Sequence, residues 1–297
     1  MKKKIYFFVG FLAILLLSSC KGRGVDNKQP NDLSNDMASD SNNIKKTLRN
    51  VYYLFPSPAE ILSAINQGGL VYEPEFLNST EKSEKYVKPN DQYLNLGIYI
   101  ADLSYCALFA RNNDAEAYLE TIKRMSDELS LSTEINKELI EKVKEKANSM
   151  DSLVKITDEF FYKAVNEMEG NNRQNDVAIV SIGAYIECLY LAVNQVKKYS
   201  RDNLIIQKIA EQKYAFNILF LYCMKHISGE ELTKSFYYIK QINDAFGKFS
   251  EHKEKVNVKK EGSSRLIISG GNTSVATEAE FISFKENIIK IRNSITK

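Results

Sequence analysis

The sequence predicts an all-α fold, an irregular bundle of about nine or ten helices, on three observations. First, apolar residues recur at helical spacing through most of residues 45–297. Second, two capping boxes open helices, one from Ser57 to Glu60 and one from Thr277 to Glu280. Third, a strand-like alternation of residue types is confined to residues 253–275. With 297 residues, the chain is long enough to bury a substantial core.

The first element, residues 1–19, has the composition of a secretory signal peptide. Three lysines, Lys2 to Lys4, precede an apolar run from Ile5 to Leu17. That run is about 13 residues long, short of the roughly 20 that a membrane span needs. Leu17-Ser18-Ser19-Cys20 then resembles a bacterial lipobox, in which the cysteine takes a lipid such as palmitate and becomes the first mature residue. The alternative is an uncleaved anchor in which Cys20 plays no part.

Residues 20–44 follow as a lipidated, flexible tether. They are rich in Asn, Asp, Ser and Gly, and as a random coil they would reach roughly 25–30 Å. Lys21-Gly22-Arg23 stands where many Bacteroidota surface lipoproteins carry a lysine followed by acids. We therefore expect an outer-membrane lipoprotein, on the periplasmic face in preference to the cell surface.

Residues 45–297 form a single helical domain in this prediction, and its first half contains four helices by capping and periodicity. Ser57 and Pro58 start the first helix, and Gly68-Gly69 ends it. The helices expected next cover 91–111, 114–128 and 133–148.

The second half continues with helices and one interruption. Val256-Asn257-Val258 and Leu266-Ile267-Ile268 lie on either side of Gly262, which fits a small hairpin or a loop near 253–275. The expected helices cover 151–168, 175–199, 204–227, 229–249 and 277–295.

Two of the helices, around 93–109 and 177–193, are apolar on nearly every side. Such a helix belongs in the centre of a core or in a membrane, and the polar residues in the second favour the core. Gly97 and Gly183 would let two helix backbones approach closely. Each helix holds one acid at its centre, Asp102 in the first and Glu187 in the second.

These two acids define a candidate buried polar site, because a buried carboxylate needs donors or a proton. Helical spacing suggests Asn95, Tyr99 and Tyr105 as hydrogen-bond partners of Asp102. It suggests Tyr185, Tyr190 and Asn194 as partners of Glu187. Arg111 or Arg173 could reach either acid from a helix end. Three interpretations stay open: a structural network, which the residues favour, a ligand-binding cleft, or an acid/base catalytic pair.

The composition and motifs give little support for a metal site, a cofactor site or nucleic-acid binding. Two His and four Cys are too few and too scattered for the usual zinc cluster, so we expect no metal and no cofactor. No nucleophile elbow or phosphate loop occurs. Without residues 1–19 the chain holds 37 basic and 38 acidic residues, which gives no reason to expect nucleic acid as a partner. Cys106, Cys188 and Cys223 are expected to be buried thiols, with a Cys106–Cys188 bridge as the alternative.

Three segments together resemble a family of all-helical Bacteroidota envelope lipoproteins of unassigned function. They are Pro56 to Glu60, Asn95 to Tyr105, and the pair Gly183 and Glu187. The resemblance implies an all-helical fold over about 45–296 and an envelope location, and it implies no catalytic residues.

The function expected from the sequence is therefore non-enzymatic. We expect a protein held in the cell envelope by a lipid on Cys20 that binds an unidentified envelope partner or small ligand. Two alternatives are a hydrolase-like or other acid/base enzyme that uses Asp102 and Glu187, and a nutrient-capture lipoprotein of an outer-membrane transporter.

Overall fold

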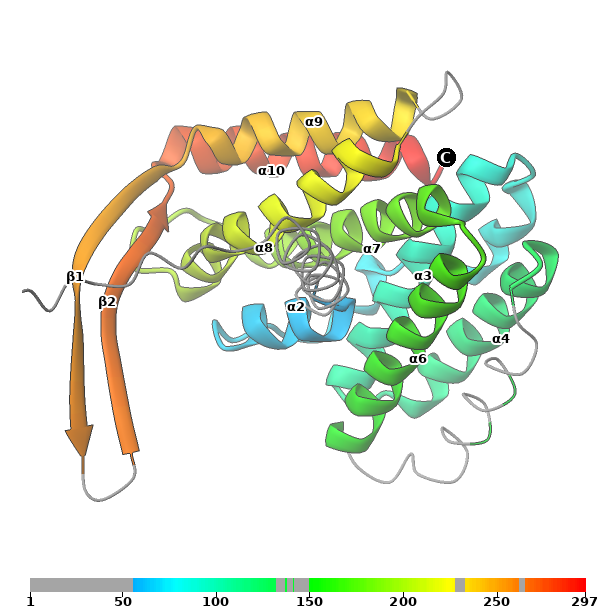
Figure 1. Ribbon diagram of the computed structural model, residues 1–297, viewed down its shortest axis with the longest axis horizontal. Coiled ribbons are helices and arrows are strands. Elements are labelled where there is room, and N and C mark those ends of the chain that lie inside the picture. Colours follow the sequence, from blue (N-terminus) through cyan, green and yellow to red (C-terminus); the bar gives the residue numbers. More distant parts are fainter. Residues whose placement is uncertain (1–55, 132–136, 138–140, 142–149, 228–232, 262–264) are drawn as a thin grey trace, which may run out of the picture. The chain divides into compact units, whose positions relative to one another are not determined.

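The computed structural model describes residues 56–131, 137, 141, 150–227, 233–261 and 265–297 (Figure 1). The predicted signal peptide and tether lie outside these residues. Within them the chain is all-helical except for one two-stranded hairpin, which confirms the predicted fold class. The α-helices are α2 (Pro58–Asn66), α3 (Pro89–Leu108), α4 (Asn112–Glu128), α6 (Met150–Gly170), α7 (Gln174–Gln195), α8 (Leu204–His226), α9 (Thr233–Gly247) and α10 (Glu278–Ile295). Two short 3₁₀ helices, η1 (Pro74–Phe76) and η2 (Thr80–Lys85), lie between α2 and α3.

Both predicted capping boxes are present. The Ser57 hydroxyl accepts a hydrogen bond from the Glu60 backbone N–H at 3.0 Å, and the Glu60 carboxylate accepts one from the Ser57 N–H at 2.9 Å. Thr277 and Glu280 make the same reciprocal pair at the start of α10. Each box satisfies two backbone donors that the first helical turn leaves without partners.

Several helix ends differ from the prediction. Helix α3 begins two residues early at Pro89, whose fixed φ suits the first turn, and it ends at Leu108 because Ala110 has a φ of +52°. Helix α7 ends at Gln195, four residues before the predicted Tyr199, because Val196 is extended. The predicted helix over 133–148 lies outside the described residues apart from Lys137 and Glu141, which are helical.

Helices α3 and α7 pack against each other at the centre of the core, and two glycines make the contact possible. A Cβ added at Gly97 would lie 1.9 Å from the Val180 carbonyl oxygen, and one at Gly183 would lie 1.9 Å from the Leu94 carbonyl oxygen. No side chain fits in such a space, so the backbones touch, as the sequence predicted. Helix α7 is the one described helix long and apolar enough to span a membrane, but most of it is buried in this core.

The three cysteines of the described chain, Cys106, Cys188 and Cys223, are free and buried. The alternative of a Cys106–Cys188 bridge is therefore not found. Burial raises the pKa of the Cys106 thiol to about 12, so this group stays protonated and packs as a small apolar side chain.

Between α9 and α10 the chain forms an antiparallel hairpin, β1 (Ser250–Glu261) and β2 (Arg265–Val275). The prediction of a hairpin or a loop near 253–275 is thus resolved in favour of the hairpin. The register shifts between Glu254 and Asn257, where two residues of β1 oppose one of β2. This β-bulge divides the ribbon into a base and an outer half.

Candidate functional site

The close crossing of α3 and α7 brings the two predicted acids together. Asp102 follows Gly97 by five residues and Glu187 follows Gly183 by four, and the two carboxyl groups are close enough for a side-chain hydrogen bond. Both side chains are fully buried, at 0% exposure. Burial and, next, the negative charge of Glu187 raise the pKa of Asp102 well above its usual range. The direction favours a neutral Asp102 beside Glu187.

The charge of Glu187 is met by an arginine from the last helix, Arg292 of α10. Arg292 Nε lies 2.9 Å from Glu187 Oε2, and Arg292 Nη2 lies 2.9 Å from Glu187 Oε1. The side chains are 6% and 0% exposed, so this two-pronged ion pair is inside the protein. Burial alone would lower the pKa of Arg292, but the charge and hydrogen bonds of Glu187 raise it overall. The guanidinium also stacks on the Tyr190 ring, 4.4 Å from its centroid.

Asp102 itself is held by one backbone group. Its Oδ2 accepts a hydrogen bond from the Asn78 N–H at 3.2 Å, whereas no donor of the described residues reaches Oδ1. A proton on Asp102 would replace its repulsion from Glu187 by a hydrogen bond between the two carboxyls. The cluster would then carry one negative charge and one positive charge, and it would be neutral as a whole.

The acids are covered by residues 71–86, here called the strap, which contains η1 and η2. Asn78 and Ser79, which join the two 3₁₀ helices, lie over the acids and are held by buried tyrosines. Tyr118 donates to the Asn78 carbonyl at 3.0 Å, and Tyr99 donates to the Ser79 carbonyl at 2.9 Å. Burial raises the pKa of both phenols, so they remain donors at any ordinary pH. The Asn78 side chain in turn donates to the Tyr86 hydroxyl at 3.3 Å.

The start of the strap is held by a second polar group. The Tyr105 hydroxyl donates to the Val71 carbonyl and accepts from the Glu73 N–H at 3.1 Å. Burial, as the largest cause, raises the pKa of Tyr105 to about 12. The Gln195 side chain, at the end of α7, also donates to the Val71 carbonyl at 2.7 Å. These bonds join the irregular strap to the helices α3 and α7.

The structure divides the predicted candidate residues into two sets. Asp102, Glu187 and Tyr190 lie together around Arg292. Tyr105, which was predicted to be a partner of Asp102, donates its hydrogen bond to the Val71 carbonyl of the strap.

Five more predicted partners lie elsewhere, and their proposed pairing with the acids is wrong. Asn95 donates to the carbonyls of Asp91 and Ile295 at 2.9 and 3.3 Å. Arg173 pairs with Asp176 at 2.8 Å and donates to the Leu129 carbonyl at 3.0 Å, and its guanidinium lies over Tyr93. Arg111 pairs with Asp114 at 3.5 Å, Tyr185 donates to the Gln212 carbonyl, and Asn194 donates to the Tyr190 carbonyl.

Sequence reasoning missed Arg292, which is the actual counter-charge. The signal was present in the last helix, where the apolar face is formed by Phe281, Phe284, Ile288 and Ile295. Arg292 falls on that face, four residues after Ile288, and an arginine in such a place needs a buried partner.

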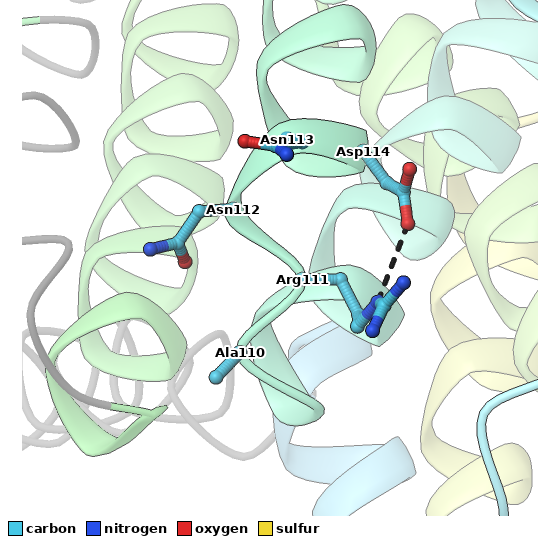
Figure 2. A pocket seen from close by; sticks show the side chains of 5 residues that line it. All are labelled: Ala110, Arg111, Asn112, Asn113 and Asp114. Atoms are coloured by element: carbon cyan, nitrogen blue, oxygen red, sulfur yellow. Dashed lines mark hydrogen bonds and ion pairs between the residues drawn. The ribbon is translucent and has the colours of Figure 1, made fainter.

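A separate hollow of about 280 Å³ lies at the turn between α3 and α4 (Figure 2). Ala110, Arg111, Asn112, Asn113 and Asp114 line it, and neither buried acid does. The Arg111–Asp114 ion pair on its wall is about half exposed, at 54% and 40%. The hollow is thus an open surface feature that is distinct from the acid cluster.

The geometry of the acid cluster matches a structural network better than a reaction centre. A general acid or base must reach its substrate, and both carboxyls are closed off from solvent. The network instead joins α3, α7, α10 and the strap, because Arg292 also donates to the Phe76 carbonyl at 3.4 Å. In the described part of the chain, no group of three or more His, Cys, Asp or Glu side chains could hold a metal ion.

No protein-family model matches the chain, and comparisons with curated proteins and with solved structures found no match. The resemblance to envelope lipoproteins therefore stays an expectation from the sequence. The function has to be argued from the residues of this chain alone.

Proposed function

We propose that this chain is a lipid-anchored protein of the cell envelope whose helical domain binds an envelope partner or ligand and catalyses no reaction. One observation carries the proposal: three lysines, an apolar run of about 13 residues and Leu17-Ser18-Ser19-Cys20 follow one another in the order that lipoprotein processing requires. A single acyl chain binds membranes only marginally, and a lipoprotein cysteine carries more than one, which gives stable attachment.

In this proposal the membrane attachment lies at the N-terminus and not in the helical domain. Among the described residues, the one helix both long and apolar enough to cross a membrane is α7, and most of it is buried in the core, so the proposal places the attachment at Cys20. The alternative of an acid/base enzyme would require the strap to lift off Asp102 and Glu187, against hydrogen bonds from Tyr99, Tyr105 and Tyr118. The alternative of nutrient capture beside an outer-membrane transporter has no specific support from these residues.

The anchor is tested on the full chain expressed in a lipoprotein-processing bacterium. Mass spectrometry of the membrane fraction should find Cys20 as the first residue, bearing diacylglycerol and fatty acid. Cys20→Ala should leave the precursor unprocessed and without lipid. Ser19→Ala keeps a small residue beside the cleaved bond, so it should be processed normally and serves as the control. A wild-type protein without lipid, or one that retains residues 1–19, would refute the anchor.

The binding role is tested separately by cross-linking in intact cells. The wild-type chain should cross-link to an envelope component. The Cys20→Ala variant, which lacks the lipid, should cross-link to it less. Equal cross-linking patterns for the two chains would contradict a role that depends on the envelope.

A further inference from the structure

The β1–β2 hairpin is a long ribbon that is attached to the helices at one end. Lys213 of α8 pairs with Glu251 at 2.8 Å, and Tyr199 donates to the Ala276 carbonyl at 2.8 Å, both at the base of the ribbon. Beyond the base the ribbon extends away from the helices (Figure 1). A two-stranded ribbon without other support is only marginally stable in water. The contacts at the base therefore leave the stability of the outer half of this hairpin unexplained.

The outer half comprises two five-residue segments, Asn257–Glu261 of β1 and Arg265–Ser269 of β2. It begins after the bulge and keeps a regular antiparallel register, with Val258 opposite Ile268 and Lys260 opposite Leu266. Because paired residues share a face of a sheet, the positions of Val258, Leu266 and Ile268 lie on one face. Lys260, which is paired with Leu266, belongs to the same face.

The two edges of the ribbon differ in charge. Strand β1 contains seven charged residues among its twelve, and charged side chains are a common protection against edge-to-edge pairing. Strand β2 carries no charge from Leu266 to Val275 and contains no proline. Among the described residues the sheet has only these two strands, so the outer edge of β2 has backbone donors and acceptors without a strand partner.

We propose that this edge pairs with the same edge of a second copy of the chain, antiparallel and centred on Ile267. In that register Ile267 opposes its own counterpart, Leu266 opposes Ile268 of the second copy, and Arg265 opposes Ser269. The segment is self-complementary in this arrangement, because apolar residues meet apolar residues and no two like charges face each other. The result is a four-stranded sheet with β1 at both outer edges, where its charges prevent further addition.

Five paired residues per chain make a small interface, below the area typical of stable dimers. The association is therefore weak and dependent on concentration in solution. A lipid anchor would confine the copies to a surface and raise their effective concentration, but the pairing itself does not depend on the anchor.

The pairing is tested by cysteine cross-linking of the full chain in cells. Paired residues of antiparallel strands have Cα atoms about 4.5–5.5 Å apart, within the range that a disulfide spans. Ile267→Cys should therefore give a disulfide-linked species of twice the mass under mild oxidation. The buried native thiols at Cys106, Cys188 and Cys223 should not contribute.

Lys259→Cys is the matched control, because Lys259 is paired with Ile267 within the ribbon but belongs to β1. In the four-stranded sheet the two Lys259 positions are three strands apart, about 14 Å, too far for a disulfide. We expect at least tenfold less cross-linking from Lys259→Cys than from Ile267→Cys. Equal cross-linking, no cross-linking of Ile267→Cys, or a product that is not twice the mass would overturn the proposal.

A non-covalent measurement completes the test. Sedimentation of the detergent-solubilised full chain over a concentration series should show self-association that Ile267→Lys weakens at least tenfold. The lysine places like charges opposite each other at the centre of the pairing. Circular dichroism should show an unchanged helical melting temperature, since the outer ribbon lies outside the helical core. Self-association unchanged by Ile267→Lys would refute the pairing while leaving the lipid anchor untouched.

Discussion

Replacing Arg292 by methionine removes the cation that neutralises the buried acid cluster. Methionine keeps an unbranched, flexible side chain of similar length, so the packing of α10 is largely preserved. Glu187 loses two charge-assisted hydrogen bonds of 2.9 Å and is left without its counter-charge at 0% exposure, with Asp102 beside it. Breaking a buried pair by removing one partner costs about 3–5 kcal/mol, and we expect a loss of that size in the free energy of unfolding at pH 7.

The assay is urea unfolding followed by far-ultraviolet circular dichroism, because the chain contains no tryptophan to serve as a fluorescence probe. Lys240→Met is the control. Its ion pair with Asp244 spans 3.4 Å with both side chains 59% exposed, so its removal should cost less than about 0.5 kcal/mol.

The double variant Arg292→Met/Glu187→Gln distinguishes an unpaired charge from lost packing. Glutamine removes the stranded negative charge, so the double variant should be more stable than Arg292→Met by at least about 1 kcal/mol. A loss below 1 kcal/mol for Arg292→Met, or a double variant as unstable as the sum of the two single changes, would refute the reasoning.

Two further predictions use the same unfolding assay. The raised pKa of Asp102 gives stability that is fully present below its unfolded value of about 3.9 and is lost as the pH rises toward the folded value. Asp102→Asn stays neutral, so its stability relative to wild type should increase between pH 4 and pH 8, and a difference that does not change with pH would contradict a raised pKa. Gly183→Ala places a Cβ 1.9 Å from the Leu94 carbonyl oxygen, so α3 and α7 must separate, at a cost of about 3 kcal/mol or more. Gly170→Ala, where no atom lies within 4 Å, should change stability by less than about 1 kcal/mol, and equal effects at the two glycines would exclude the close crossing.

The correctly predicted features are those set by neighbours in the chain. The capping boxes at Ser57 and Thr277 depend on residues three positions apart, and both are present. The burial of Asp102 and Glu187 followed from helices that are apolar on every side, and Gly97 and Gly183 marked where those helices touch. These features depend on residues that are close together in the sequence, so hydrophobic periodicity and residue spacing indicate them directly.

The partners of the buried acids could not be predicted in the same way. Arg292 lies 105 residues after Glu187, and helical spacing within α7 pointed to Tyr185, Tyr190 and Asn194 instead. The strap has no repeating pattern, since its backbone is held by tyrosine hydroxyls from α3 and α4 and not by its own periodicity. Both features arise only when distant elements meet.

By itself, the sequence determined the all-α fold class, the two apolar helices at the centre of the core, and where in those helices the acids lie. Helical hydrophobic periodicity and helix caps involve residues a few positions apart, so both can be recognised in the sequence. Only the tertiary structure decided that the two acids lie beside one arginine, that the strap covers them, and that both edges of the ribbon lack a further strand among the described residues. Those outcomes depend on which surfaces pack together, and packing joins residues from 20 to 105 positions apart.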